Sequence, residues 1–268
     1  GLVGSEMCIR DRRDPSRMAE VLNRVIEKAF RGSAPAQINV PRDYWTQVID
    51  MELPPIVRFE RQGGGKEAIE NAAKLLSKAK FPVILSGAGV VLGGAIDECK
   101  KLAEKLDAPV CNGYQHNDSF PGSHPLAVGP LGYNGSKAAM ELISKADVVL
   151  ALGTRLNPFS TLPGYGIDYW PKKATIIQVD MNPDRIGLTK KVSVGICGDA
   201  KQVAQQILDK LSSDAGNTGR EERKNLIHKT KSAWLQTLSG LDHEEDDPGT
   251  VWNKEARERD KDRMSPRQ

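Results

Sequence analysis

Long apolar runs are missing from this sequence of 268 residues. The longest ones, such as residues 82–85 and 148–152, are far shorter than the roughly 20 residues that a membrane-spanning helix needs. We therefore expect no segment that crosses a membrane, and no membrane partner.

Cysteine is scarce and scattered. The four cysteines are Cys8, Cys99, Cys111 and Cys197, and they form no CxxC pair and have no histidine pair nearby. This pattern argues against a zinc site and against a disulfide framework. It favours a chain without a metal site of its own, working in a reducing cytoplasm.

Catalytic constellations are also missing. The histidines are His116, His124, His228 and His243, and none has a cysteine or aspartate at triad spacing. Ser86 and Ser160 lack the GxSxG elbow that presents a serine nucleophile. We interpret the histidines as solvated or locally bonded side chains and predict no catalytic residue in this chain.

Charge of one sign does not dominate. The sequence has 38 Lys and Arg against 35 Asp and Glu, and the basic residues are scattered among the acidic ones. Nucleic-acid-binding domains instead gather their basic residues into a patch. Hydrophobic residues make up 39% and charged residues 27%, which is typical of a soluble globular protein. We expect no nucleic-acid partner.

The first segment, residues 1–12, has neither the apolar core of a signal peptide nor a helical period. It resembles the translated sequence of a transposase adapter used in library preparation. We therefore expect the native sequence to begin near Arg13, and the gene to be truncated upstream.

Residues 13–52 look like the end of an α/β domain. Apolar residues recur at helical spacing over 14–30, and the alternating, β-branched stretch 36–40 is typical of a short strand. Residues 53–65 contain Pro54, Pro55 and three successive glycines, a composition that favours an interdomain linker.

Residues 66–211 alternate short apolar strands with amphipathic helices. The expected strands are 82–85, 109–111, 147–152, 175–179 and 192–196, and the expected helices are 66–79, 95–106, 138–144 and 200–211. Such alternation predicts an α/β fold of the Rossmann-like, doubly wound type, with a parallel sheet and helices on both faces. In residues 212–268 we expect a mostly polar helix over 220–241 and then a charged linker.

Three strand ends carry residues suited to a nucleotide. Gly87, Ala88 and Gly89 follow the first strand of this domain, Gly153, Thr154 and Arg155 follow a buried strand, and Asp180 closes another. Ligands of open parallel sheets bind at such ends, so glycine backbone and Arg155 could hold a pyrophosphate while Asp180 holds a ribose hydroxyl. Alternatively, the glycines serve tight turns and close packing, and Arg155 makes an ordinary ion pair. The full GxGxxG spacing is absent, because Gly93 comes one residue late.

A long loop rich in glycine and amides spans residues 112–122 and has a counterpart at 132–135. Loops of this length tend to be functional. This one is equally suited to a ligand site and to a subunit contact.

The sequence resembles the three-domain thiamine-diphosphate enzymes, such as acetolactate synthase and pyruvate oxidase. The likeness covers residues 13–268 and is carried by motifs in several segments: Ile38-Asn-Val-Pro-Arg-Asp-Tyr-Trp45, Ser86-Gly-Ala-Gly89, Asn112-Gly-Tyr-Gln-His-Asn-Asp118, Leu152-Gly-Thr-Arg155 with Leu-Asn-Pro-Phe159, and Gln178-Val-Asp180. The amino-acid sequences of these motifs are most similar to those of the sulfoacetaldehyde acetyltransferase branch of that family.

The resemblance implies a central domain of the NAD- and FAD-binding type, preceded by the end of a pyrimidine-binding domain and followed by a missing diphosphate-binding domain. It implies a reaction in which sulfoacetaldehyde and phosphate give acetyl phosphate and sulfite, in an enzyme that forms a dimer or tetramer. Thiamine diphosphate and Mg²⁺ would bind outside this fragment, because Gly198-Asp-Ala200 is only a partial match to the family's Gly-Asp-Gly stretch. The resemblance also allows for a vestigial nucleotide site in the central domain, since some relatives hold FAD or ADP there.

Two alternatives stay open. One is acetolactate synthase or another acyl-transferring relative. The other is a free-standing nucleotide-binding module that uses Gly87, Gly89, Arg155 and Asp180.

Overall fold

The structure is a computed structural model that describes residues 9–11, 15–32, 34–50, 52–55, 60–132 and 134–241. The chain divides into two compact units, residues 1–61 and 62–268. The charged linker predicted after residue 241 lies outside the described residues, as does part of the interdomain linker.

The first unit is a single strand–helix–strand motif. Strand β1 (Ile9–Asp11) pairs in parallel with β2 (Gln37–Asn39), and α1 (Met18–Gly32) connects them after the short turn η2 (Pro15–Arg17). Val21 and Val25 form the buried side of α1. The predicted helix and the strand β2 are confirmed. Strand β1 was not predicted, and the adapter origin of its segment stays a prediction.

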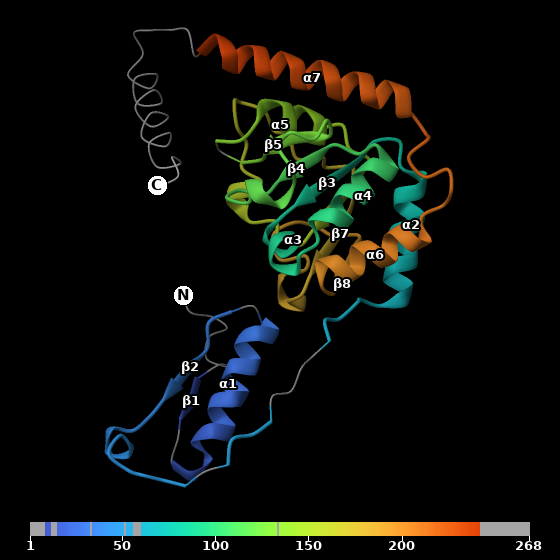
Figure 1. Cartoon of the computed structure of the whole chain (residues 1–268). Coiled ribbons are helices and arrows are strands. Elements are labelled where there is room, and N and C mark those ends of the chain that lie inside the picture. The colour runs from blue at the N-terminus through green and yellow to red at the C-terminus, as the bar shows by residue number, and fades with distance from the viewer. Residues whose placement is uncertain are drawn as a thin grey trace, which may run out of the picture. The chain divides into compact units, whose positions relative to one another are not determined.

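The described part of the second unit contains one parallel sheet. Its strands are β3 (Pro82–Ser86), β4 (Val110–Asn112), β5 (Ala127–Pro130), β6 (Val148–Leu152), β7 (Thr175–Asp180) and β8 (Val194–Cys197). They lie in the order β5-β4-β3-β6-β7-β8, and every pair is parallel (Figure 1). This is the doubly wound order, in which the chain starts in the middle and builds outwards twice, so the predicted fold class is confirmed.

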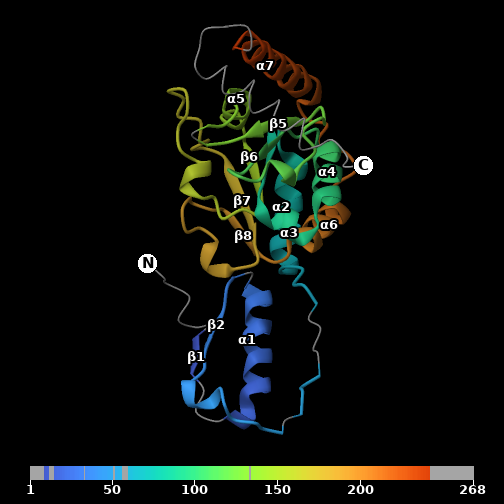
Figure 2. The ribbon, with the colours of Figure 1, turned by 60° about the vertical axis from the view of Figure 1, so that its left-hand side comes forward.

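In the described part of the second unit, six α-helices accompany the sheet. They are α2 (Lys66–Lys78), α3 (Ala88–Gly93), α4 (Ile96–Leu106), α5 (Lys137–Ile143), α6 (Ala200–Lys210) and α7 (Arg220–Leu241). Helices α2, α4 and α6 lie together on one side of the sheet, and irregular segments cover β6 and β7 on the other side (Figure 2). The crossovers from β6 to β7 and from β7 to β8 contain only the short turns η5 (Pro158–Ser160) and η6 (Pro183–Arg185).

Two elements were missed in the sequence. Strand β5 contains Gly129, with φ of 93°, and ends in Pro130, so it has none of the alternation or apolar continuity that indicates a strand. Helix α3 begins in the glycine segment after β3, where we predicted no helix, and it ends at Gly94 in the left-handed conformation. Both are short elements that only their tertiary contacts fix.

The centre of the sheet holds the core. Every residue of β3 and β6 is buried, because helices or loops cover both faces. Such strands are apolar without alternation, which is why these two could be predicted. Burying a Leu or Ile side chain such as Ile84 or Leu150, both fully buried, contributes about 1.5–3 kcal/mol.

A buried arginine fixes the start of α7. The Arg223 side chain is 1% exposed and donates to main-chain carbonyls only. Its Nε bonds to Asp107 (2.9 Å), its Nη1 to Lys80 (2.5 Å) and Thr218 (2.9 Å), and its Nη2 to Leu106 (2.9 Å) and Gly216 (2.6 Å). All five guanidinium donors therefore have acceptors. Two of them lie at the end of α4, where a cation complements the helix dipole. Burial lowers the pKa of Arg223.

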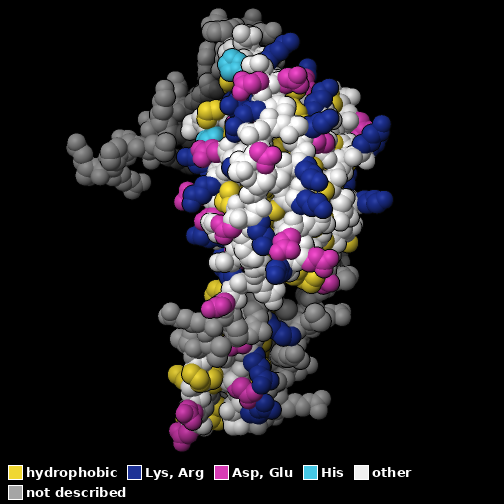
Figure 3. Space-filling model, turned by 90° about the vertical axis from the view of Figure 1, so that its right-hand side faces the viewer, with side chains coloured by type: hydrophobic (Ala, Val, Ile, Leu, Met, Phe, Trp, Pro, Cys, Tyr) yellow, Lys and Arg dark blue, Asp and Glu magenta, His cyan; other side chains and the backbone are white. Residues whose placement is uncertain are grey.

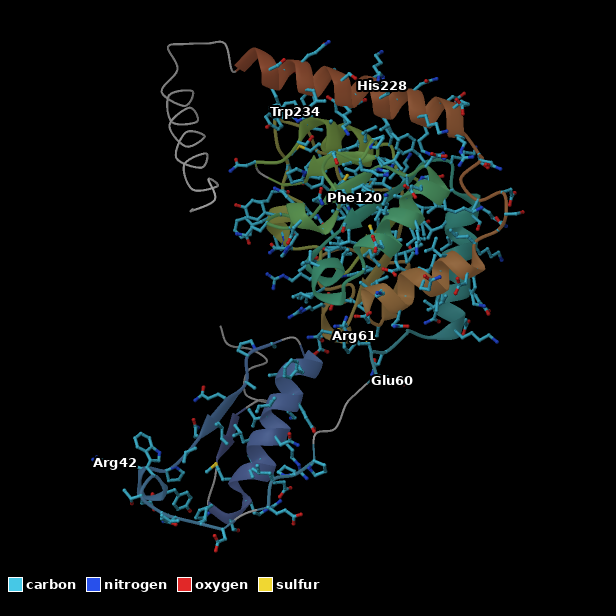
Figure 4. The ribbon with its side chains drawn as sticks, viewed as in Figure 1. Arg42, Glu60, Arg61, Phe120, His228 and Trp234 are labelled. Atoms are coloured by element: carbon cyan, nitrogen blue, oxygen red, sulfur yellow. The ribbon has the colours of Figure 1, made fainter. Side chains whose placement is uncertain are left out.

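The rest of α7 has few apolar contacts with the domain. Ile227 is buried, and the Lys231 ammonium donates to the carbonyl of His124 at 3.0 Å. Trp234, which is labelled on α7 in Figure 4, packs edge-on against Tyr165 with ring centroids 5.8 Å apart. The prediction of a mostly polar helix is confirmed, and polar bonds supply much of its attachment.

On the surface, Lys and Arg lie among Asp and Glu over the face shown in Figure 3. Within the described part of the chain, no helix combines the length and the apolar character needed to cross a membrane.

We expect Arg223→Met to destabilise the second unit by about 3 kcal/mol or more, because buried carbonyls lose a charged donor that nothing replaces. Lys224→Met is the matched control: Lys224 is its neighbour on α7 and is exposed, so its loss costs less than about 0.5 kcal/mol. Urea denaturation followed by circular dichroism measures both. Equal midpoints for the two variants would contradict the role given to Arg223.

Candidate functional site

The order of the strands reverses between β3 and β6. Parallel sheets of this type bind ligands at the carboxyl ends of the strands beside such a switch point. The predicted residues all lie there: Gly87, Ala88 and Gly89 follow β3, Gly153, Thr154 and Arg155 follow β6, and Asp180 is the last residue of β7. The structure thus brings the three predicted strand ends to adjacent positions.

The two glycine segments, at the start of α3 and after β6, are in direct backbone contact. The Gly89 amide donates to the Gly153 carbonyl at 2.8 Å, and the Gly87 amide donates to the Leu152 carbonyl at 3.1 Å. A Cβ atom on Gly89 would lie 2.7 Å from the Gly153 Cα, and one on Gly87 would lie 2.5 Å from the Thr154 Cβ. The close approach of the loops explains the glycines without a ligand, which is the alternative left open by the sequence.

The same contact uses the amides that a phosphate would need. At the start of α3 the Gly89 amide is bonded to Gly153, and the Val90 amide is bonded to the Gly87 carbonyl at 3.0 Å. Amides at the start of a helix bind anions when they are free to point at them. Here two of them point at protein oxygens.

Most polar side chains of the candidate site accept hydrogen bonds from the main chain of the turns in which they lie. Thr154 Oγ1 accepts from the Leu156 amide at 3.2 Å, and Leu156 is buried with φ of 53°, a conformation that is strained for leucine. Asp180 is 8% exposed as a residue, and its carboxylate accepts from the Asn182 amide at 2.9 Å. Arg155 is exposed, and its side chain has no bonding partner among the described residues.

Gln178 organises these loops and was not predicted as a site residue. Its Nε2 donates to the carbonyls of Thr154 (3.1 Å) and Arg185 (3.2 Å), and its Oε1 accepts from the Gly187 amide (2.9 Å). The side chain is 1% exposed. The sequence signal for this role was the side-chain amide of Gln178 within the otherwise apolar strand β7. A buried polar group of this kind needs hydrogen-bond partners.

The long loop after β4 is held by a buried polar network. Asn112 Nδ2 donates to Ser119 Oγ at 3.0 Å and to the His116 carbonyl at 3.3 Å. Ser86 Oγ, at the end of β3, donates to the Ser119 carbonyl at 3.2 Å. The loop is therefore fixed across the ends of β3 and β4.

Aromatic side chains from two loops meet over this edge. The rings of Tyr114 and Phe159 stack with centroids 6.2 Å apart, and 60% of Phe159 is exposed. Ser160 connects the loops, because its Oγ accepts from the Tyr114 amide at 2.9 Å and its carbonyl accepts from the Tyr169 hydroxyl at 3.2 Å. Burial raises the pKa of Tyr169 to about 12, so this hydroxyl stays a donor at neutral pH.

No nucleophile or metal site is found in the described part of the second unit. Burial raises the pKa of Cys99 to about 12 and raises the pKa values of Cys111 and Cys197 as well, which makes all three thiols poor nucleophiles. In the described ranges there is no group of three His, Cys, Asp or Glu side chains able to hold a metal ion. The arrangement can support loops and present aromatic rings, but it contains no acid–base pair.

Residues 69–207 match the family model described as the thiamine pyrophosphate enzyme, central domain. The chain is 78% identical over 256 residues to a probable sulfoacetaldehyde acetyltransferase of Rhizobium meliloti (strain 1021), with 96% of this chain and 43% of that protein covered. It is 75% identical over 255 residues to the sulfoacetaldehyde acetyltransferase of Roseovarius nubinhibens, covering 95% of this chain and 42% of that protein.

A solved structure with a similar fold is benzoylformate decarboxylase from Polynucleobacter necessarius. The TM-score is 0.65 at 20% sequence identity, and the match covers 79% of this chain and 40% of that one. At this identity the likeness concerns the fold alone. The family match spans more than half of the chain, and this chain therefore belongs to the thiamine pyrophosphate enzymes, of which it carries the central domain.

Proposed function

We propose that this chain is the part of a sulfoacetaldehyde acetyltransferase that carries the central domain. The observation behind the proposal is the identity of 78% and 75% to proteins of that name over at least 95% of the chain. The chain spans about 43% of the length of these relatives. The complete enzyme would convert sulfoacetaldehyde and phosphate to acetyl phosphate and sulfite, as a cytoplasmic dimer or tetramer.

The described residues do not fit the cofactor. Binding of a diphosphate through Mg²⁺ needs oxygen ligands free to face the metal, and the partial motif Gly198-Asp199-Ala200 would have to supply them. Asp199 instead caps α6: it is 1% exposed, and its Oδ1 accepts from the amides of Lys201 and Gln202. We therefore place thiamine diphosphate and Mg²⁺ on other parts of the complete enzyme.

The central domain would then act as a rigid support. Its loops at the carboxyl edge are fixed by the Gly89–Gly153 backbone contact and by Gln178. Rigid elements hold neighbouring functional groups in place better than flexible ones. We assign no step of the reaction to a side chain of this domain.

A free-standing nucleotide-binding module is the alternative from another class. It would use the predicted set Gly87, Ala88, Gly89, Gly153, Thr154, Arg155 and Asp180. The amide contacts described above speak for the supporting role, because Gly89 and Val90 already have acceptors. The assignment of these seven residues to a ligand stays a prediction.

The first test is an assay of the complete enzyme, obtained by sequencing across both ends of the gene. With thiamine diphosphate, Mg²⁺, sulfoacetaldehyde and phosphate we expect acetyl phosphate and sulfite in equal amounts. Pyruvate in place of sulfoacetaldehyde is the control for the acetolactate synthase alternative. Acetolactate formation from pyruvate, with no release of sulfite from sulfoacetaldehyde, would reject the proposal.

The second test separates support from nucleotide binding. Isothermal titration of the 268-residue chain with FAD or ADP should give no saturable binding. The module alternative instead requires a dissociation constant on the order of 1 μM, or about −8 kcal/mol, with Arg155→Ala weakening it. Observation of such binding, and of its loss in the variant, would favour the module.

The third test concerns the loop contact itself. Gly89→Ala places a methyl group 2.7 Å from the Gly153 Cα, and overpacking of this kind costs about 1–3 kcal/mol. Gly122→Ala is the control, because a Cβ there meets no atom within 4 Å. Thermal denaturation should show a lower midpoint for Gly89→Ala only. Unchanged stability of both variants would mean that the loops are not in close contact.

A further inference from the structure

The turn that enters β5, residues 121–127, is centred on a histidine with two bonded ring nitrogens. The Leu126 amide donates to His124 Nδ1 at 3.2 Å. His124 Nε2 lies 3.2 Å from Glu104 Oε1. Because Nδ1 accepts a hydrogen bond, the proton of the neutral ring must be on Nε2, which donates to Glu104.

Besides α4, which carries Glu104, three further elements meet at this turn. The Leu126 carbonyl accepts from the Val110 amide of β4 at 2.8 Å. The His124 carbonyl accepts from the Ala127 amide, at the start of β5, at 3.0 Å. The same carbonyl accepts from the Lys231 ammonium of α7 at 3.0 Å. A change in the turn is therefore transmitted to the outer strand and to α7.

The surroundings of the ring are only partly exposed to water. The side chain of His124 is 13% exposed, and Phe120 packs edge-on against it with ring centroids 5.1 Å apart. On the described part of the chain, the charged groups bonded to the turn are Glu104 of α4 and Lys231 of α7, and Lys100 lies 3.9 Å from Glu104.

Imidazole is the side chain that ordinarily gains a proton between pH 5 and 8. A second proton on this ring goes to Nδ1 and turns it into a donor that faces the donor amide of Leu126. That hydrogen bond is then lost. The attraction between a charged ring and Glu104 compensates little, because half of the Glu104 side chain is exposed and exposed ion pairs are weak.

We propose that His124 is a proton-sensitive switch at this turn: the neutral ring closes the turn through Leu126, and its protonation opens the turn and loosens the attachment of α7 at Lys231. This regulatory device is independent of the function proposed for the complete enzyme.

Hydrogen exchange of the full chain, followed by NMR at pH 8 and pH 5.5, tests the switch. Exchange rates are divided by the intrinsic rate at each pH, so that only the change in protection remains. We expect the protection of the Leu126 amide to fall by about fivefold at pH 5.5, the effect of losing one hydrogen bond. The Trp234 amide on α7 should lose protection over the same pH range. Protection that does not change with pH would overturn the proposal.

Two variants separate His124 from other titrating groups. In His124→Asn the side-chain oxygen can still accept from Leu126 and does not titrate, so protection should be independent of pH. His228→Gln removes an exposed histidine from α7 and should behave like the wild type. A pH-dependent loss that persists in His124→Asn would overturn the proposal.

The wild type alone supplies a further measurement if His124→Asn does not fold. Long-range ¹H–¹⁵N spectra show which ring nitrogen of His124 carries the proton. A proton on Nε2 at pH 8, followed by a second one on Nδ1 as Leu126 loses protection, is expected. A proton on Nδ1 at pH 8 would overturn the proposal.

Discussion

The contact between the loops after β3 and β6 is the constraint on which the carboxyl edge depends. These strands pair in the middle of the sheet, and the main chains that leave them touch at Gly89 and Gly153. Only glycine permits this approach, and the resulting hydrogen bond from Gly89 to Gly153 fixes the direction in which both segments continue. Thr154 and Gln178 extend the same constraint to the segment after β7. The conformation of the segments at the carboxyl ends of these strands is therefore set more by main-chain packing than by side-chain chemistry.

The parts of the fold that could be predicted are those in which local pattern and burial agree. Strand β6 is an unbroken apolar run because both of its faces are covered, and α2 shows its buried side at helical spacing. Strand β5 and helix α3 escaped prediction because glycines interrupt them. The residues predicted for a ligand site do lie on neighbouring strand ends, because a parallel sheet places the carboxyl ends of its strands along one edge. Their roles could not be predicted, because whether the Gly89 amide faces a phosphate or a carbonyl depends on a residue 64 positions away, Gly153.

Helix α7 shows how a helix with little apolar contact is kept on a domain. The guanidinium of Arg223 replaces water for five carbonyl bonds, Lys231 binds the turn at His124, and the indole of Trp234 contacts Tyr165. Directional bonds of this kind break one at a time, unlike a continuous apolar face. The contacts of α7 with the domain can therefore be lost separately. They are lost most readily in the C-terminal half of the helix, which Arg223 does not hold.

The shape of β5 has a consequence for association between molecules. An outer strand with free amides and carbonyls is a template on which strands of other molecules can add. Here the outer strand spans only Ala127–Pro130, is distorted beside Gly129 where its register with β4 shifts, and ends in a residue without an amide hydrogen. Proline and irregular register are the features that block such addition. These features of four residues disfavour growth of the sheet by edge-to-edge addition on this side.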